Sequence, residues 1–144
     1  MSDSYLIVGG SSDIARVVAT NLLSSGKRVT LVARDESRVS DLINQGAKAI
    51  IGDSLNQEII AEAIEVAMAS GGGKISGVAH LVGSIAIRPP HAMKIDAFQD
   101  VITTNLTSAF LTLSMVGKAM LKSGGGKMVF TSSVAATLGL VNHE

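Results

Sequence analysis

Two patterns of apolar residues alternate along this chain. Short apolar runs, rich in valine and isoleucine, are separated by longer segments in which apolar residues recur every three or four positions. The short runs are typical of buried strands, and the periodic segments are typical of helices. The pattern predicts five strands, at residues 6–8, 28–33, 48–52, 77–82 and 127–132. It predicts helices at residues 13–25, 36–45, 57–70 and 95–122, and a loop over residues 133–144.

This alternation predicts an α/β fold. Strands that alternate with helices form βαβ units, whose parallel sheet is covered on both faces. Because such crossovers are right-handed, the expected architecture is a doubly wound parallel sheet, a Rossmann fold with three α/β/α layers. Residues 1–144 are expected to form one domain, incomplete at its C-terminus because no helix follows the fifth strand. Ligands of this fold bind beyond the carboxyl ends of the strands, so the loops that follow the strands are the candidate sites.

Apolar periodicity also predicts which residues share a helix face. The apolar side of helix 13–25 consists of Ile14, Val17, Val18 and Leu22. The inward residues of helix 36–45 are Val39, Leu42 and Ile43. The long helix 95–122 carries one stripe of residues at three- and four-residue spacing: Phe98, Val101, Ile102, Asn105, Ala109 and Leu113.

The long helix is apolar on two sides. Val101, Asn105 and Leu113 are expected to face the sheet, and Leu106, Phe110 and Met120 are expected to face partly away from it. Large exposed apolar surfaces usually mark interfaces. The sequence therefore predicts a homo-oligomer that forms through helix 95–122.

Composition and charge exclude several classes of protein. With 144 residues, 47% of them hydrophobic, the chain is neither disordered nor collagen-like. Its 12 basic and 12 acidic residues leave no basic face for a nucleic acid. The absence of cysteine excludes disulfides and thiolate metal sites and fits a reducing compartment. No targeting signal and no run of 18 apolar residues is present, so we expect a cytoplasmic protein without a membrane partner.

No metal site is expected. The three histidines, His80, His91 and His143, do not have the spacing of metal ligands. His80 lies at the end of a predicted buried strand and is interpreted as a core histidine with satisfied hydrogen bonds.

A glycine-rich loop joins the first predicted strand to the first helix, with the sequence Gly9-Gly10-Ser11-Ser12-Asp13-Ile14. Glycine allows the backbone to turn sharply and to approach a pyrophosphate, and the helix N-terminus offers free N–H groups. We therefore predict a dinucleotide site formed by Gly9, Ser11, Ser12 and the Ile14 amide. Asp13 has two open interpretations: a helix N-cap, or an acid that competes with the phosphates for the positive helix end.

This loop resembles that of the short-chain dehydrogenase/reductase family, Thr-Gly-x-x-x-Gly-x-Gly. Gly9 matches the first glycine, Asp13 stands at the second and Ala15 at the third. Alanine at the third position is a mild change, since that glycine serves helix packing. Asp13 is the main departure from the family's pattern.

The residue that ends the second strand indicates which dinucleotide binds. An acid at this point binds the 2′-OH of NAD, whereas a basic residue accommodates the 2′-phosphate of NADP. This chain has Arg34 there, with Arg38 about one turn further on. NADP is therefore predicted over NAD. The alternative is a surface ion pair of Arg34 with Asp35 or Glu36.

Two further strand ends resemble the family's cofactor site. Asp53 and Ser54 follow the third strand, where the family has a pair that meets the adenine ring; the alternative is a helix cap by Ser54 or Asn56. The fourth strand ends in His80-Leu81-Val82-Gly83, where the family usually has Asn-Asn-Ala-Gly. Both asparagines are replaced, and the resemblance implies that Val82 and Gly83 lie beside the cofactor ribose.

Two residues match the family's catalytic positions. Asn105 lies in an Asn-Leu-x-x-x-Phe setting, and the resemblance implies a role in a proton relay and in positioning a catalytic lysine. Ser133, after the fifth strand, matches the serine that stabilises the substrate carbonyl; the alternative is a polar loop residue. The family's Tyr-x-x-x-Lys motif is expected just beyond Glu144, and the one tyrosine present is Tyr5.

The resemblance implies an NADP-dependent oxidoreductase that transfers a hydride between the cofactor and a carbonyl or alcohol of a small-molecule substrate. Without the tyrosine and lysine, the 144-residue chain is expected to lack normal turnover. The alternative is a non-catalytic nucleotide-binding or interaction protein of the same fold.

Overall fold

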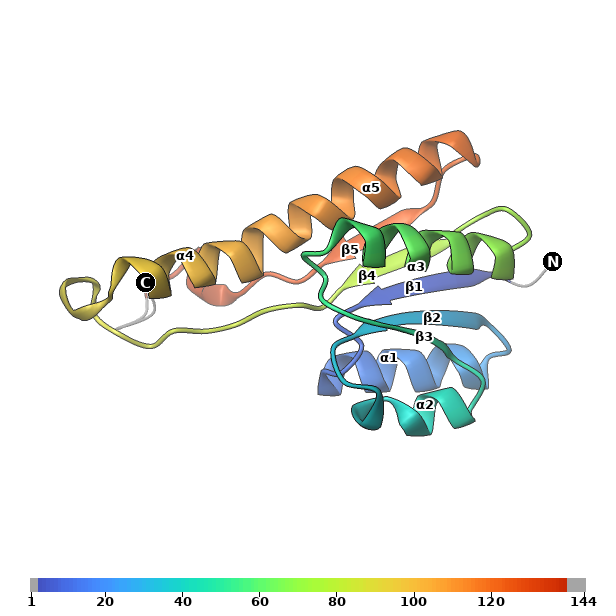
Figure 1. Ribbon diagram of the computed structural model, residues 1–144, viewed down its shortest axis with the longest axis horizontal. Coiled ribbons are helices and arrows are strands. Elements are labelled where there is room, and N and C mark those ends of the chain that lie inside the picture. Colours follow the sequence, from blue (N-terminus) through green and yellow to red (C-terminus); the bar gives the residue numbers. More distant parts are fainter. Residues whose placement is uncertain (1–2, 140–144) are drawn as a thin grey trace.

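A five-stranded parallel sheet forms the centre of the computed structural model, which describes residues 3–139 (Figure 1). The strands are β1 (Ser4–Val8), β2 (Arg28–Ala33), β3 (Lys48–Ile51), β4 (Gly77–His80) and β5 (Lys127–Phe130). Their order across the sheet is β3-β2-β1-β4-β5, and every neighbouring pair is parallel. The chain moves one way from β1 to β3 and then crosses to the other side of β1, which makes the fold doubly wound. The predicted Rossmann fold is confirmed.

Helices cover both faces of this sheet. Helices α1 (Asp13–Ser24) and α2 (Ser40–Asn44) lie on one face, and α3 (Gln57–Ser70) and α5 (Ser108–Lys122) lie on the other (Figure 1). Helix α4 (Ile95–Ile102) lies beyond the carboxyl ends of the strands, at the tip of a long arm. This arm and the strand ends frame the region in which ligands of doubly wound sheets bind.

The core has two apolar layers because neighbouring strand residues point to opposite faces. Leu6 and Val8 belong to the layer that packs against α3 and α5, together with Ile60 and Val116. The residue between them, Ile7, belongs to the layer on the α1 and α2 side. The alternation along β1 thus joins the two layers through one strand, whose residues Leu6, Ile7 and Val8 are at most 1% exposed.

The buried side of α1 differs from the prediction. Ile14 and Val17 are 60% and 61% exposed, whereas Ala15 and Ala19 are fully buried. Val18 and Leu22 are partly buried against the same core, as expected. The two alanines face the sheet because small side chains allow close approach of α1, and the larger residues lie on its free flank. On the neighbouring segment, Val39, Leu42 and Ile43 face inward as predicted.

Two predicted helices are interrupted. Segment 36–45 divides into a 3₁₀ turn (Glu36–Arg38) and α2. The long segment 95–122 consists of α4, a π-helical turn (Thr103–Thr107) and α5. Other 3₁₀ turns are Pro90–Ala92 and Val134–Ala136. The predicted loop over 133–144 therefore contains one 3₁₀ turn, and its residues 140–144 lie outside the described part of the chain.

The π-helical turn changes which face of the long helix is buried. The buried residues of α5 are Ser108, Thr112, Val116 and Met120, at four-residue spacing. Leu113 is 50% exposed and Met120 is 4% exposed, so the predicted orientation of both is wrong. A π-turn holds more residues than an α-turn. Helical spacing counted from Val101 through Asn105 therefore reaches the wrong face of α5. Leu106 and Phe110 are exposed, as predicted.

Candidate functional site

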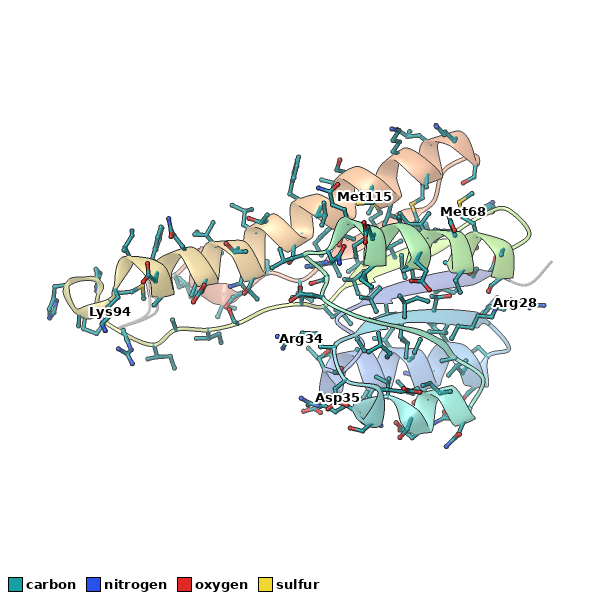
Figure 2. All side chains as sticks on the ribbon, viewed as in Figure 1. Arg28, Arg34, Asp35, Met68, Lys94 and Met115 are labelled. Carbon is teal, nitrogen blue, oxygen red and sulfur yellow. The ribbon has the colours of Figure 1, made fainter. Side chains whose placement is uncertain are left out.

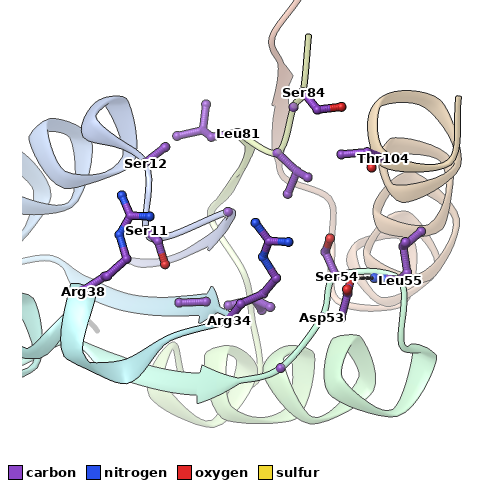
Figure 3. Close-up of a pocket in the computed structure, with 16 residues that line it drawn as sticks. Ser11, Ser12, Arg34, Arg38, Asp53, Ser54, Leu55, Leu81, Ser84 and Thr104 are labelled. Carbon is purple, nitrogen blue, oxygen red and sulfur yellow. Dashed lines mark hydrogen bonds between the residues drawn. The ribbon is translucent and has the colours of Figure 1, made fainter. Parts of the chain in front are cut away.

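A cleft of about 400 Å³ lies beyond the carboxyl ends of the central strands (Figure 3). Its walls are the loops after β1, β2, β3 and β4, with Thr104 of the π-helical turn on one side. The predicted site residues among its lining are Gly9, Ser11, Ser12, Arg34, Asp53, Ser54, Val82 and Gly83. Asp13 and Ile14 are exposed and do not line the cleft. The cleft thus occupies the point at which the strand order reverses.

The loop after β1 passes very close to the chain that leaves β4. A Cβ atom on Gly9 would lie 2.7 Å from the Leu81 carbonyl carbon and 2.8 Å from the Val82 nitrogen. Gly9 also has a φ of +92°, in the left-handed region that favours glycine. Its amide donates a hydrogen bond of 3.1 Å to the Val32 carbonyl oxygen. Only glycine therefore allows the loops after β1, β2 and β4 to meet at the floor of the cleft.

Ser12 is the N-cap of α1. Its φ and ψ of −79° and 155° are extended, and its Oγ accepts a hydrogen bond of 3.2 Å from the Ala15 amide. The interpretation of Asp13 as the N-cap is therefore wrong: Asp13 is in the first helical turn. Its carboxylate still lies at the positive end of the helix dipole.

Ser11 carries a buried hydroxyl with no protein partner. Its Oγ is shielded from solvent and makes no hydrogen bond to the residues that the structure describes. Buried hydroxyls are normally hydrogen-bonded, and the exceptions call for a reason. Ser11 lines the cleft, so a group with polar atoms bound there would supply the missing partner.

Arg34 and Arg38 extend from the loop after β2 into the same cleft (Figure 3). In residues 3–139 the ion pairs join Arg16 to Asp41 and Lys27 to Asp3, so the proposed alternative pairing of Arg34 with Asp35 or Glu36 is not formed. Asp35 instead caps the following 3₁₀ turn through the hydroxyl and amide of Ser37.

The Asp35 cap keeps this carboxylate away from Arg34. The Ser37 hydroxyl, together with the Ser37 amide, holds the pKa of Asp35 below its usual value, so this carboxylate stays ionised while bound to its own turn. The guanidinium of Arg34 therefore reaches the cleft without an internal counter-ion in the described chain.

Asp53 and Ser54 form the opposite wall. The Asp53 Oδ1 accepts a hydrogen bond of 2.8 Å from the Leu55 amide, drawn as a dashed line in Figure 3. Asn56 is the N-cap of α3, through a bond of 2.8 Å from the Glu58 amide to its Oδ1. The cap alternative thus holds for Asn56, while Asp53 and the buried Ser54 line the cleft.

Asn105 binds the segment that follows β4. Its Oδ1 accepts from the Ser84 amide at 2.9 Å, and its Nδ2 donates to the Ser84 carbonyl oxygen at 3.0 Å. The Nδ2 also donates to the Val101 carbonyl oxygen at 2.9 Å, within the same helix. A Cβ atom on Gly83 would lie 3.3 Å from the Asn105 Oδ1. The amide of Asn105 therefore fixes the backbone between the cleft and the neighbouring hollow.

This second hollow, of about 740 Å³, adjoins the cleft and shares Val82, Gly83 and Ser84 with it. Asn105 of the π-helical turn and Ser133 of the segment after β5 both line it. The Ser133 Oγ accepts a hydrogen bond of 3.2 Å from the Ala135 amide at the start of a 3₁₀ turn. Its hydroxyl hydrogen is not used in that bond, so Ser133 can still donate to an oxygen in the hollow.

His80 is a buried histidine with satisfied hydrogen bonds, as predicted. It is 2% exposed, and its ring nitrogens lie 3.0 Å from the Thr112 Oγ1 and 3.1 Å from the Ser108 Oγ. Burial lowers the pKa of His80, because a charged imidazole would lose its hydration there. The ring is therefore neutral near pH 7.

Ser84 and Thr104 are site residues that sequence reasoning missed. Ser84 lies between a strand and the arm, and its role depends on backbone atoms, which carry no sequence signal. Thr104 reaches the cleft because the π-helical turn reorients it. The sequence signal that could have pointed to these residues is Asn105, an asparagine inside an apolar helical stripe. Asparagine is a poor helix former, and a buried asparagine side chain needs hydrogen-bond partners nearby.

Neither a membrane span nor a metal cluster is found between residues 3 and 139. No helix there has both the length and the apolar character needed to cross a bilayer. No three potential metal ligands come together in that range, and His143 lies outside it.

The fold and the cleft together define a doubly wound α/β protein with a cleft at its topological switch point. A family model for the short chain dehydrogenases matches residues 4–143, and the chain therefore belongs to that family.

Similar sequences are oxidoreductases. An uncharacterized oxidoreductase of Mycobacterium tuberculosis is 30% identical, with 94% of this chain and 52% of that protein covered. The 3-oxoacyl-(acyl-carrier-protein) reductase FabG of Salmonella typhimurium is 28% identical, with 93% of this chain and 56% of the reductase covered. The chain thus spans about half the length of the curated relatives it matches.

Solved structures show the same relationship. A short-chain type dehydrogenase/reductase from Mycobacterium ulcerans superposes with a TM-score of 0.88 at 25% identity, covering 97% of this chain and 55% of that one. A variant of actinorhodin polyketide ketoreductase, solved with NADPH, superposes with a TM-score of 0.87 at 25% identity, covering 99% of this chain and 57% of that one.

Proposed function

We propose that this chain binds NADP(H) as part of an oxidoreductase that transfers a hydride between the cofactor and a carbonyl or alcohol of a small molecule. Family membership supports the reaction class. The observation that carries the choice of NADP(H) is Arg34, whose guanidinium enters the cleft directly after β2 with no acidic partner in residues 3–139. A guanidinium is always charged and binds phosphate through two parallel hydrogen bonds.

Three features of the cleft fit a dinucleotide phosphate. Gly9 lets the loop after β1 pass against the backbone of Leu81 and Val82, where any side chain would collide. The Ser11 hydroxyl is buried, has no hydrogen-bond partner within residues 3–139, and can donate to a phosphate oxygen. Ser12 starts α1, whose N-terminal amides are a favourable environment for an anion, with the Ile14 amide among them.

The other residues that line the cleft would contact different parts of the cofactor. In the proposal, Arg34 holds the 2′-phosphate, with Arg38 beside it, and Asp53 and Ser54 lie at the adenine. Val82 and Gly83 lie at the second ribose, where the Asn105 amide fixes the chain.

The second hollow is the proposed substrate site. When bound, NADPH supplies the hydride for a carbonyl carbon. Ser133 would donate its free hydroxyl hydrogen to the carbonyl oxygen and stabilise the negative charge that develops there. Asn105 lines the other wall of the hollow. Its side chain holds the segment 82–84, which the cofactor cleft and the hollow share, in place.

The proposal is tested by titrating the chain with NADPH and with NADH, using the fluorescence of the reduced nicotinamide. Tighter binding of NADPH is expected, because one charge-assisted contact is typically worth about 1.5–3 kcal/mol, or about ten- to a hundredfold in affinity. Equal affinities would remove the basis for NADP(H). No binding of either cofactor would refute the function as a whole.

Asp13 is expected to weaken phosphate binding, because its charge lies at the same helix end as the proposed site. Both Asp13→Asn and Asp13→Gly should tighten NADPH binding about two- to fivefold, the usual strength of one charge at a helix terminus. Asp13→Asn keeps the shape of the side chain, so it isolates the charge, and Asp13→Gly should also destabilise α1. Calorimetric titration measures the change. Weaker binding by both variants would mean that Asp13 organises the loop.

We also propose that the chain self-associates through the long helical segment 95–122. This segment carries an apolar stripe of exposed residues at three- and four-residue spacing: Phe98, Ile102, Leu106, Phe110 and Leu113. The chain exposes 8486 Å², about 1,500 Å² more than a folded monomer of its mass is expected to expose. A standard interface buries about 800 Å² on each partner, so the excess is large enough for one.

Phe110→Glu is expected to dissociate this assembly, because it places a charge within the stripe. Phe110 is 65% exposed, so the substitution should leave the folded chain intact. Val17→Glu is the matched control: Val17 is 61% exposed but lies on α1, across the sheet. Light scattering at micromolar concentration gives the mass. A wild-type mass of 14.8 kDa, that of one chain, would contradict self-association.

A further inference from the structure

Three buried polar residues connect the end of β4 to the π-helical turn. His80 lies between Thr112 and Ser108, which are one α-helical turn apart on the buried face of α5. All three residues are at most 2% exposed. His80 also lines the second hollow, whereas Ser108 and Thr112 line neither the cleft nor the hollow. Ser108 directly follows the π-helical turn Thr103–Thr107, which carries Asn105.

The hydrogens in this network have one consistent arrangement. The Ser108 hydroxyl donates to the Thr104 carbonyl oxygen, which can only accept. A serine hydroxyl has one hydrogen, so toward His80 the Ser108 oxygen must accept. His80 therefore carries its hydrogen on Nε2, and its Nδ1 accepts from the Thr112 hydroxyl. The neutral ring that burial favours is the form this arrangement requires.

The Ser108 hydroxyl replaces a backbone donor that the π-turn has moved. In a regular α-helix, the amide of Ser108 would donate to the carbonyl oxygen of Thr104. Here that amide donates to the Thr103 carbonyl oxygen, one residue further back. The side chain of the same residue donates to Thr104 instead. The π-turn is therefore stabilised by a hydroxyl whose orientation His80 sets.

The π-turn determines which side chains line the cleft and the hollow. It brings Thr104 to the wall of the cleft and Asn105 to the Ser84 backbone. An α-helix turns about 100° per residue, so a return to regular α-helical bonding would rotate Asn105 away from Ser84. The segment 81–84 between the two sites would then lose its hydrogen bonds to the helix.

We propose that His80 and Ser108 are positioning residues of this site, which hold the π-helical turn so that Asn105 fixes the segment beside the cofactor cleft. The inference deepens the proposed function and rests on it for the identity of the ligand. It assigns a use to a histidine at a position where resemblance to the family predicts asparagine.

Hydrogen exchange at the Ser84 amide tests the inference, because that amide donates to Asn105. In Ser108→Ala, exchange at Ser84 should accelerate about tenfold, the typical effect of losing one hydrogen bond. NADPH binding should weaken in the same variant. Thr112→Val is the matched control: it is buried on the same face and loses the other bond to His80, but it keeps the Ser108 hydroxyl. Its Ser84 exchange should stay within about twofold of wild type.

A second measurement addresses His80 itself. The ¹⁵N spectrum of the histidine rings should show Nε2 protonated and Nδ1 unprotonated for His80 in the wild type. An Nδ1–H tautomer, or Ser84 exchange unchanged in Ser108→Ala, would overturn the inference. Equal acceleration in Thr112→Val would also overturn it, because general destabilisation would then explain both. If the wild type shows the expected Ser84 protection but binds no NADPH, the proposed function fails and the structural role of Ser108 stands.

Discussion

Replacing Gly9 by alanine is expected to destabilise the fold by about 3 kcal/mol or more, at the upper end of single substitutions. The left-handed φ of +92° alone costs an alanine about 1–2 kcal/mol. The new Cβ would also lie 2.7–2.8 Å from backbone atoms of Leu81 and Val82, which cannot rotate away as a side chain can. The loops after β1 and β4 must then separate, so the cleft should lose cofactor binding as well.

Gly124→Ala separates these two causes. Gly124 has a φ of +93°, almost the same as Gly9, but nothing lies within 4 Å of its Cβ position. Urea denaturation of both variants should give a cost of about 1–2 kcal/mol for Gly124→Ala, the backbone term alone. Equal losses in the two variants would show that the close approach of the loops contributes nothing.

Arg34→Ala is expected to weaken NADPH binding about ten- to a hundredfold and to leave NADH binding nearly unchanged. The loss corresponds to about 1.5–3 kcal/mol for one charged hydrogen-bonded contact. NADH has no 2′-phosphate, so the guanidinium has no comparable partner on it. Calorimetric titration of each cofactor into the wild type and the variant gives both ratios.

Arg28→Ala is the control for general charge. Arg28 and Arg34 lie at opposite ends of β2, and both are exposed (Figure 2). Arg28→Ala removes the same net charge at a distance from the cleft, and it should leave both affinities unchanged. If Arg34→Ala weakens NADPH and NADH by the same factor, Arg34 contacts a part that the two cofactors share.

The fold could be predicted because it depends on residue periodicity. Apolar runs such as Leu6-Ile7-Val8 are buried on both faces, as strands of a covered parallel sheet must be. Five such runs with helices between them allow few topologies other than the doubly wound sheet. Helix α3 has the predicted bounds of 57–70 for the same reason, with a capping residue before it and glycine after it.

Local details could not be predicted where two residues compete for one role. Ser12 and Asp13 are both good N-caps, and the extended backbone of Ser12 decides between them. The π-helical turn is not visible in the apolar spacing, because it is defined by a backbone bond, from the Ser108 amide to the Thr103 carbonyl oxygen. The orientation of Leu113 follows from that turn.

Part of the candidate site could be predicted from the sequence, because several of its residues directly follow predicted strands. Arg34 and Asp53 lie directly after β2 and β3, and parallel strands bring these ends together. Ser84 and Thr104 were missed because one acts through its backbone and the other depends on helical phase. The chemical character of a side chain can be inferred from the sequence. The contributions of Ser84 and Thr104 depend on the backbone conformation, which only the folded structure shows.

The most direct test of NADP(H) binding is ³¹P NMR of NADP⁺ with and without the protein. A free phosphate monoester has a second pKa near 6, and contact with a guanidinium should lower it by favouring the dianion. At about pH 6, the 2′-phosphate resonance should move to its dianionic position on binding, and Arg34→Ala should abolish this change. A 2′-phosphate that titrates identically in the free and protein-containing samples would contradict a contact between Arg34 and the 2′-phosphate.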